Sequence, residues 1–163
     1  SPEDQDCLPH FELPAPMTES GADPNQFPLL LVSQQLITRT ENWQGVIPSL
    51  QECVGLQSFM KWDSWVEINP HTAEELDIHN GDRVWVESPQ GKLQAIVRLY
   101  EGLWPNAVYL PPGMGHRTLV KWGRAASDNW EVGVNPNRLV EFGDEAISGQ
   151  AIFSPTRVRI YKS

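Results

Sequence analysis

The glycine-rich segment Gly-Met-Gly-His-Arg at 113–117 carries groups that could bind a ligand through hydrogen bonds. It follows an apolar stretch that reads as a strand, and its glycines would let the backbone approach an anionic or planar ligand closely. His116 and Arg117 add donors of the kind that bind phosphate oxygens. A plain turn with an exposed histidine is the simpler interpretation, because a single glycine loop is weak evidence for a site.

A second segment, Gly-Val-Asn-Pro-Asn-Arg-Leu at 133–139, places two amides and a guanidinium around a proline. The amides of Asn135 and Asn137 each offer a carbonyl oxygen and two N–H donors, which suits the edge of an amide-like heterocycle. Residue types alone favour equally well a turn in which an asparagine side chain bonds its own backbone. Both interpretations stay open at this level.

The acids, histidines and cysteines form no recognisable catalytic or metal-binding pattern. The chain contains no G-x-S-x-G, no H-E-x-x-H, no Walker loop and no G-x-G-x-x-G that opens a helix. Asp82 could serve as a general base, but ordering a tight turn before a strand is the simpler role, and His71 and His79 are expected to face solvent. Cys7 and Cys53 lack the paired spacing of a metal site. We therefore predict no catalytic residue and no metal ligand.

Short strands separated by Gly/Pro turns must position the two loops. The apolar patterns predict strands over 28–33, 65–68, 83–87, 93–99, 107–110 and 157–161. Asn69-Pro70 predicts the start of one short helix over 71–77, and Ser-Pro-Gln-Gly at 88–91 predicts a hairpin turn. The long polar stretch 34–61 is expected to be functional or built from small irregular elements. The pattern indicates a mainly β barrel or sandwich with short helical inserts.

Charge is distributed unevenly over the 163 residues, whose net charge is −9. Residues 1–27 hold six acids, five prolines and no Lys or Arg, so we predict an acidic, Pro-rich linker or arm there and the barrel domain over 28–163. The rest of the chain, at −3, has no basic stripe, which argues against nucleic acid and an anionic membrane surface as partners. No apolar run approaches a membrane span, and no targeting signal is visible. A start without Met predicts a piece excised from a longer protein.

Seven segments occur in an order that resembles the C-terminal molybdopterin dinucleotide-binding domain of the dimethyl-sulfoxide-reductase-type molybdenum oxidoreductases. The first four are Trp-Val-Glu-Ile-Asn-Pro at 65–70, Thr-Ala-Glu-Glu-Leu at 72–76, Gly-Asp-Arg-Val at 81–84 and Glu-Ser-Pro-Gln-Gly-Lys at 87–92. The later three are Pro-Pro-Gly-Met-Gly-His at 111–116, Trp-Gly-Arg-Ala-Ala at 122–126 and the segment 133–139. They are similar to one branch, which includes the large subunits of the quinone reductase complex and of alternative complex III. The resemblance covers about 28 to 161.

The resemblance implies a double-psi β-barrel with short helical inserts. It also implies that the domain closes over a molybdopterin guanine dinucleotide, with molybdenum or tungsten, held mainly by other domains. The residues expected to face the cofactor are Ser33, Gln34, Gln35, Gly115, His116, Arg117, Asn135 and Asn137. In this family the metal's protein ligand and the iron–sulfur cluster belong to earlier domains. The domain alone is therefore expected to catalyse nothing and to hold no cofactor by itself.

The implied partners are the N-terminal domains of the same parent protein, together with iron–sulfur and membrane subunits of a redox complex. Direct membrane insertion of this domain is not expected. Relatives of this branch often face the periplasm, but this chain carries no signal, so its location is left open.

Two departures from the branch support an alternative. Ser49 stands where the branch tends to have Trp, and Trp122 stands where it has Tyr. Some relatives keep the barrel without the cofactor, so the alternative is a cofactor-free structural module that docks subunits in a membrane-associated electron-transfer complex. A small standalone enzyme of the aspartate decarboxylase type, on a related barrel, is not favoured, because the chain has no adjacent Gly-Ser pair to process.

Overall fold

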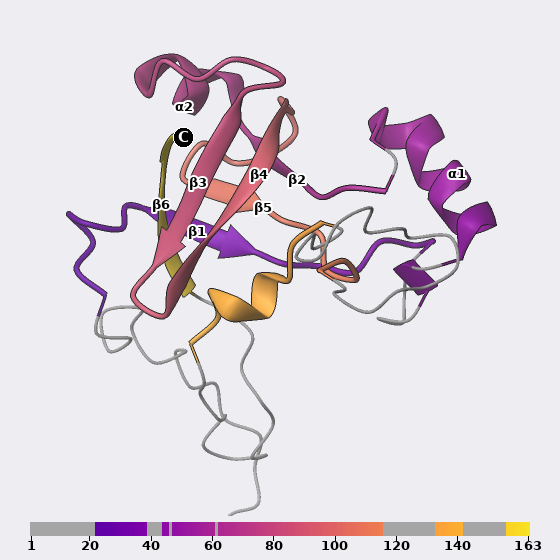
Figure 1. Cartoon of the computed structure of the whole chain (residues 1–163). Helices are drawn as coiled ribbons and strands as arrows, with labels where there is room; N and C mark the ends of the chain where they lie inside the picture. Colours follow the sequence, from indigo (N-terminus) through magenta and orange to yellow (C-terminus); the bar gives the residue numbers. More distant parts are fainter. Residues whose placement is uncertain (1–21, 39–43, 46, 61, 116–132, 142–155) are drawn as a thin grey trace, which may run out of the picture.

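Six strands form a closed barrel at the centre of the computed structural model (Figure 1). The structure describes residues 22–38, 44–45, 47–60, 62–115, 133–141 and 156–163. The strands are β1 (Leu29–Val32), β2 (Trp65–Ile68), β3 (Arg83–Ser88), β4 (Gly91–Leu99), β5 (Ala107–Tyr109) and β6 (Thr156–Lys162). They lie close to the predicted positions, and they close in the order β1-β5-β2-β4-β3-β6.

Two early strands are inserted between pairs of later strands. β2 lies between β4 and β5, parallel to β4 and antiparallel to β5. β1 lies between β5 and β6 in the same way, parallel to β5 and antiparallel to β6. An earlier strand held between two consecutive later strands is a psi motif, and here two such motifs share β5. The expected double-psi β-barrel is confirmed.

Alternation along the strands fills the barrel interior. Val84 and Val86 of β3 are fully buried in the core, whereas Trp85 and Glu87 face outward, as the period of two requires. Other fully buried apolar side chains of the core are Val66, Ile68, Val97, Val108, Leu110, Leu139 and Val158. Burial of each large apolar side chain contributes about 1.5–3 kcal/mol relative to an exposed one.

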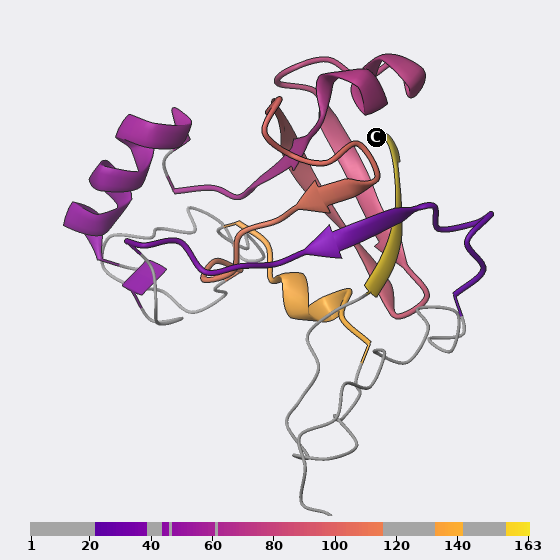
Figure 2. The ribbon, with the colours of Figure 1, turned by 180° about the vertical axis from the view of Figure 1, so that it is seen from behind.

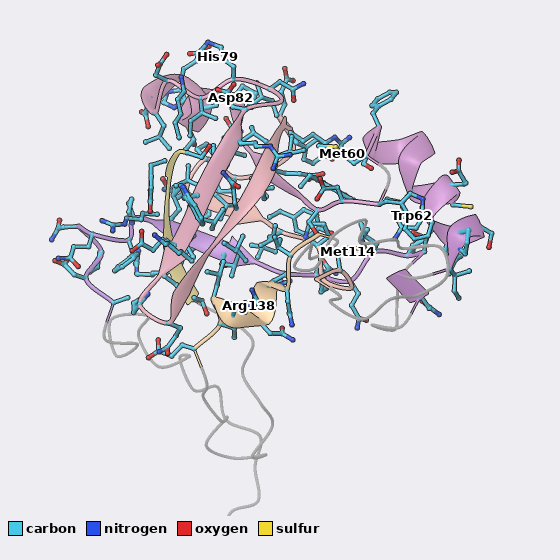
Figure 3. All side chains as sticks on the ribbon, viewed as in Figure 1. Met60, Trp62, His79, Asp82, Met114 and Arg138 are labelled. Carbon is cyan, nitrogen blue, oxygen red and sulfur yellow. The ribbon has the colours of Figure 1, made fainter. Side chains whose placement is uncertain are left out.

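The predicted short helix is α2 (Pro70–Glu75). Asn69 Oδ1 accepts a hydrogen bond from His71 N at 2.9 Å, and Pro70 occupies the first helical position, where its missing N–H is not needed. In the turn that follows, Asp82 Oδ2 accepts from His79 N at 2.9 Å. His71 and His79 are both exposed, as predicted, and Asp82 orders the turn. Figure 3 shows His79 and Asp82 together at the end of the barrel that carries α2.

A second helix, α1 (Pro48–Ser58), lies within the stretch 34–61, which was expected to be functional or built from small irregular elements. Figures 1 and 2 show it standing to one side of the barrel, away from the strands. Among its described side chains, Gln51, Val54 and Ser58 are buried, and Ser58 Oγ donates to Val54 O. The expectation of small irregular elements here was wrong for 48–58, because a helix with so few apolar residues has no clear 3.6-residue pattern.

The described residues that precede β1 pack on the barrel. Ala22 and Phe27 are buried, and the guanidinium of Arg159 on β6 lies 5.5 Å from the centre of the Phe27 ring. Residues 1–21 of the predicted acidic arm lie outside the described residues. The domain boundary at residue 28 stays a prediction.

Glu87 makes an outward-facing ion pair that predicts a dependence of stability on pH. Its carboxylate accepts from Arg159 Nη2 at 3.0 Å and from Tyr161 Oη at 2.8 Å, and these hydrogen bonds, chiefly that from Arg159, lower the pKa of Glu87. A carboxyl whose pKa is lower in the folded than in the unfolded state stabilises the fold above the unfolded pKa. That contribution is lost as the pH falls through the folded pKa.

We therefore expect Glu87→Gln to lose less stability than the unaltered protein when the pH falls from above the unfolded-state pKa of Glu87 to below its folded-state pKa. The effect should be small, because partly exposed ion pairs contribute little. Thermal unfolding at neutral and acidic pH measures the difference, with Glu74→Gln on the exposed face of α2 as the control. Identical losses for Glu87→Gln and the unaltered protein would show that the Arg159 pair does not lower this pKa.

Candidate functional site

A pocket of about 480 Å³ lies where the loops after β1 and β5 meet. Because β1 and β5 are parallel, with Leu31 opposite Val108, their carboxyl ends reach the same edge of the barrel. Residues 33–35 leave β1 there, and residues 112–115 follow β5. The strand pairing thus brings together two loops that are far apart in the sequence.

The turn η2 (Pro136–Arg138) supplies a further wall of the pocket. Asn135 Oδ1 accepts from Asn137 N at 3.0 Å, so the side-chain-to-backbone turn considered from the sequence is present. Directly after η2, Leu139 is fully buried in the core, and its carbonyl oxygen accepts from Ser88 Oγ at 2.8 Å. These contacts fix η2 and leave Asn137 exposed at the pocket.

Six of the eight predicted site residues line this pocket, and the structure brings them together from three separate segments. They are Ser33, Gln34, Gln35, Gly115, Asn135 and Asn137. The other two, His116 and Arg117, lie outside the described residues. The other lining residues are Pro112, Gly113, Met114 and Val140. Gly113 and Met114 belong to the loop 113–117 that the sequence had marked, whereas sequence reasoning did not select Pro112 or Val140, and Val140 carries no signal of its own.

The described lining offers uncharged hydrogen-bonding groups next to apolar ones. The Ser33 hydroxyl and the amides of Gln34, Gln35 and Asn137 have no side-chain hydrogen bond to another described residue, while Met114 supplies apolar surface. The Gln34 backbone is held, because its carbonyl oxygen accepts from Tyr109 Oη at 3.0 Å. A volume within the usual range for small-molecule sites, with several free amides, suits a flat polar heterocycle.

The two central loops touch through their backbones at Gly115. Its φ is +90°, which side chains disfavour, and a Cβ there would lie 2.5 Å from Asn135 N. Glycine at this position therefore lets the loop after β5 approach η2. Any larger residue would push Asn135 and its neighbour Asn137 out of place.

Two further features of the described residues bear on function. Nowhere in this part of the chain do three His, Cys, Asp or Glu side chains lie close enough to hold a metal ion. None of the described helices is long and apolar enough to cross a membrane.

Comparisons with known proteins agree with this architecture. The family model described as "Molydopterin dinucleotide binding domain" matches residues 49–156. The arsenate respiratory reductase molybdopterin-containing subunit ArrA of Shewanella sp. strain ANA-3 is 28% identical over 160 residues, which are 95% of this chain and 18% of that protein. The menaquinone reductase, molybdopterin-binding-like subunit of Nitratidesulfovibrio vulgaris is 28% identical over 101 residues, 62% of this chain and 14% of that subunit.

A solved structure shows the same fold. Acetylene hydratase from Pelobacter acetylenicus superposes with a TM-score of 0.67 at 16% identity, over 96% of this chain and 21% of that one. The chain thus spans about a fifth or less of the proteins it matches. The family model covers more than half of the chain, and the chain therefore belongs to the molybdopterin dinucleotide-binding domain family.

Proposed function

We propose that the pocket between the loops after β1 and β5 binds part of a molybdopterin guanine dinucleotide, in a redox protein of which this chain forms one domain. One observation carries the proposal. Six residues that the family resemblance singles out, from three separate segments, line a single pocket, and the side-chain amides of Gln34, Gln35 and Asn137 bond no other described residue. The barrel brings the three segments together, and the hydrogen-bonding side chains that they place in the pocket support its use for a polar ligand.

The pocket residues divide by chemistry. The amides of Gln34, Gln35 and Asn137 and the hydroxyl of Ser33 would bond the ring nitrogens and carbonyl of the pterin. Gly115 would let the backbone approach the cofactor, and we assign the phosphates to His116 and Arg117. When bound, the cofactor supplies two-electron redox chemistry, and this chain binds and orients it.

The activity, substrate and partners of the whole protein are part of this proposal, because the chain spans only a small share of its relatives. Several relatives are named as subunits, so redox partner subunits are the expectation for this protein as well. The N-terminal domains of the parent protein would hold the metal ligand and most of the cofactor. Iron–sulfur and membrane subunits would exchange electrons with it. The proposal covers a molybdenum and a tungsten form of the cofactor alike.

Asn137→Ala in the full-length protein is the direct test. Loss of the exposed amide removes one or two hydrogen bonds to the pterin, so we expect about tenfold weaker cofactor retention with an unchanged melting temperature. Pterin and metal content per protein measure retention. Asn106→Ala is the matched control, because Asn106 is exposed before β5, at the end of that strand away from the pocket. Unchanged pterin content in Asn137→Ala would refute its assignment.

One observation favours a second candidate, the cofactor-free structural module. The relative from Nitratidesulfovibrio vulgaris is named "molybdopterin-binding-like", and it matches 62% of this chain. Metal and pterin analysis of the intact full-length protein separates the two candidates. A preparation with no molybdenum, no tungsten and no pterin would establish the structural module.

A further inference from the structure

A glutamine is fully enclosed beside the pocket. Gln51 lies on α1, and its side chain has no exposed surface. Burial of an amide costs free energy unless its donors and its acceptor are bonded. A buried glutamine on a helix that stands apart from the barrel therefore needs an explanation in its contacts.

The amide of Gln51 joins three other segments. Its Nε2 donates to Gly45 O and to Met114 Sδ, the latter at 3.2 Å, and its Oε1 accepts from Trp62 N at 3.3 Å. Both donors and the acceptor are thus used. Met114 is 63 residues away in the sequence, and it lines the pocket.

Met114 is held from its other side as well. A Cβ on Gly133 would lie 2.6 Å from Met114 Cβ and 2.6 Å from Ser64 Oγ, so Gly133 packs tightly against both side chains. Ser64 Oγ accepts from Val134 N at 2.9 Å, which fixes the segment that leads to η2. Figure 3 shows Met114 between the turn that carries Arg138 and the segment at Trp62.

The neighbouring residue of the pocket loop is packed just as closely. A Cβ on Gly45 would overlap Gly113 O, so the two backbones lie in contact. Gln51 bonds the carbonyl of the same Gly45. The Gln51 amide therefore holds both the backbone at Gly45 and, through Met114, the loop of residues 113–115 that packs on it.

We propose that Gln51 is a positioning residue of the pocket, which sets Met114 and through it the loop of residues 113–115. This inference rests on the proposed function. It gives α1 a role in the site, since α1 delivers a buried amide to the pocket wall. Gln51 itself does not touch the cofactor.

The test compares Gln51→Leu with Gln90→Leu in the full-length protein. Leucine fills a similar volume without the amide, and Gln90 lies exposed in the β3–β4 hairpin. Hydrogen exchange is measured at Trp62, at residues 110–115 and across β3 and β4, together with pterin content. In Gln51→Leu we expect about tenfold faster exchange at Trp62 and residues 110–115, unchanged exchange in β3 and β4, and a severalfold loss of pterin. Gln90→Leu should match the unaltered protein.

Unchanged exchange at residues 110–115 would overturn the proposal, and so would faster exchange there with full pterin content. Faster exchange throughout the barrel would mean that Gln51→Leu unfolds the domain. Met114→Leu then decides, because it removes the sulfur acceptor and keeps an apolar side chain of similar volume: faster exchange confined to residues 110–115 supports the proposal, and no change there overturns it.

A mutant cycle adds a readout that a general loss of stability would not give. If Gln51 acts through Met114, the effect of Gln51→Leu at residues 110–115 is smaller in the Met114→Leu background, whereas independent effects add. An unaltered protein without pterin would refute the proposed function, and the exchange data would still decide whether Gln51 positions the loop.

Discussion

Gly115→Ala is expected to remove most of the bound cofactor from the full-length protein while the barrel stays folded. The alanine must adopt a φ of +90°, which costs about 1–2 kcal/mol for a residue with a side chain. Its Cβ would also lie 2.5 Å from Asn135 N. The loop that follows β5 must therefore move away from η2. That movement displaces the pocket wall that carries Asn137.

Gly81→Ala is the matched control for this change. Gly81 has a φ of +91°, but nothing lies within 4 Å of a Cβ built there. Both variants therefore carry the backbone strain, and only Gly115→Ala carries the contact with Asn135. We expect a fall in melting temperature in both variants, larger in Gly115→Ala because of this contact, and a loss of pterin in Gly115→Ala alone. Equal pterin content in the two variants would contradict the role assigned to this contact.

Leu139→Ala is expected to cause the largest loss of stability. Leu139 is fully buried in the core directly after η2, and truncation of such a residue costs about 2–5 kcal/mol. Since Leu139 anchors η2, we also expect the Asn135–Asn137 turn to lose its place and pterin content to fall. Denaturant unfolding of the full-length protein and pterin analysis measure the two effects.

Leu76→Ala is the matched control, with the same chemical change at a site that is 40% exposed after α2. It should cost less than about 1 kcal/mol, because little apolar surface returns to water. Similar losses for the two leucines would mean that Leu139 does not contribute to the core as described. A stability loss in Leu139→Ala with full pterin content would mean that its anchoring of η2 does not matter to the pocket.

The sequence by itself determined the strands and the α2 cap, because their signals are local. Val84 and Val86 alternate with Trp85 and Glu87, and a period of two identifies a half-buried strand without knowledge of its partners. Asn69-Pro70 begins α2 through contacts within three residues. The order of motifs identified the double-psi barrel as a resemblance, and the strand pairing confirmed it.

Helix α1 depended on tertiary contacts. Its stretch is polar, and its decisive buried residue is Gln51, a type that is normally exposed. The amide is buried because Gly45, Trp62 and Met114 satisfy it, and Met114 is 63 residues away. No local pattern encodes such a contact, so the sequence could not predict either the helix or its place beside the pocket.

For the pocket too, the sequence indicated the candidate residues, and tertiary contacts decided whether they meet. Glycine and amide residue types marked the loops at 113–117 and 133–139, but their chemistry favoured a plain turn at 113–117 and left one equally open at 133–139. Their meeting with residues 33–35 was decided by the parallel pairing of β1 with β5 and by the contact of Gly115 with Asn135. The β1–β5 pairing and the Gly115–Asn135 contact each join segments that are distant in the chain. They form only when the barrel closes, so no local run of residues encodes them.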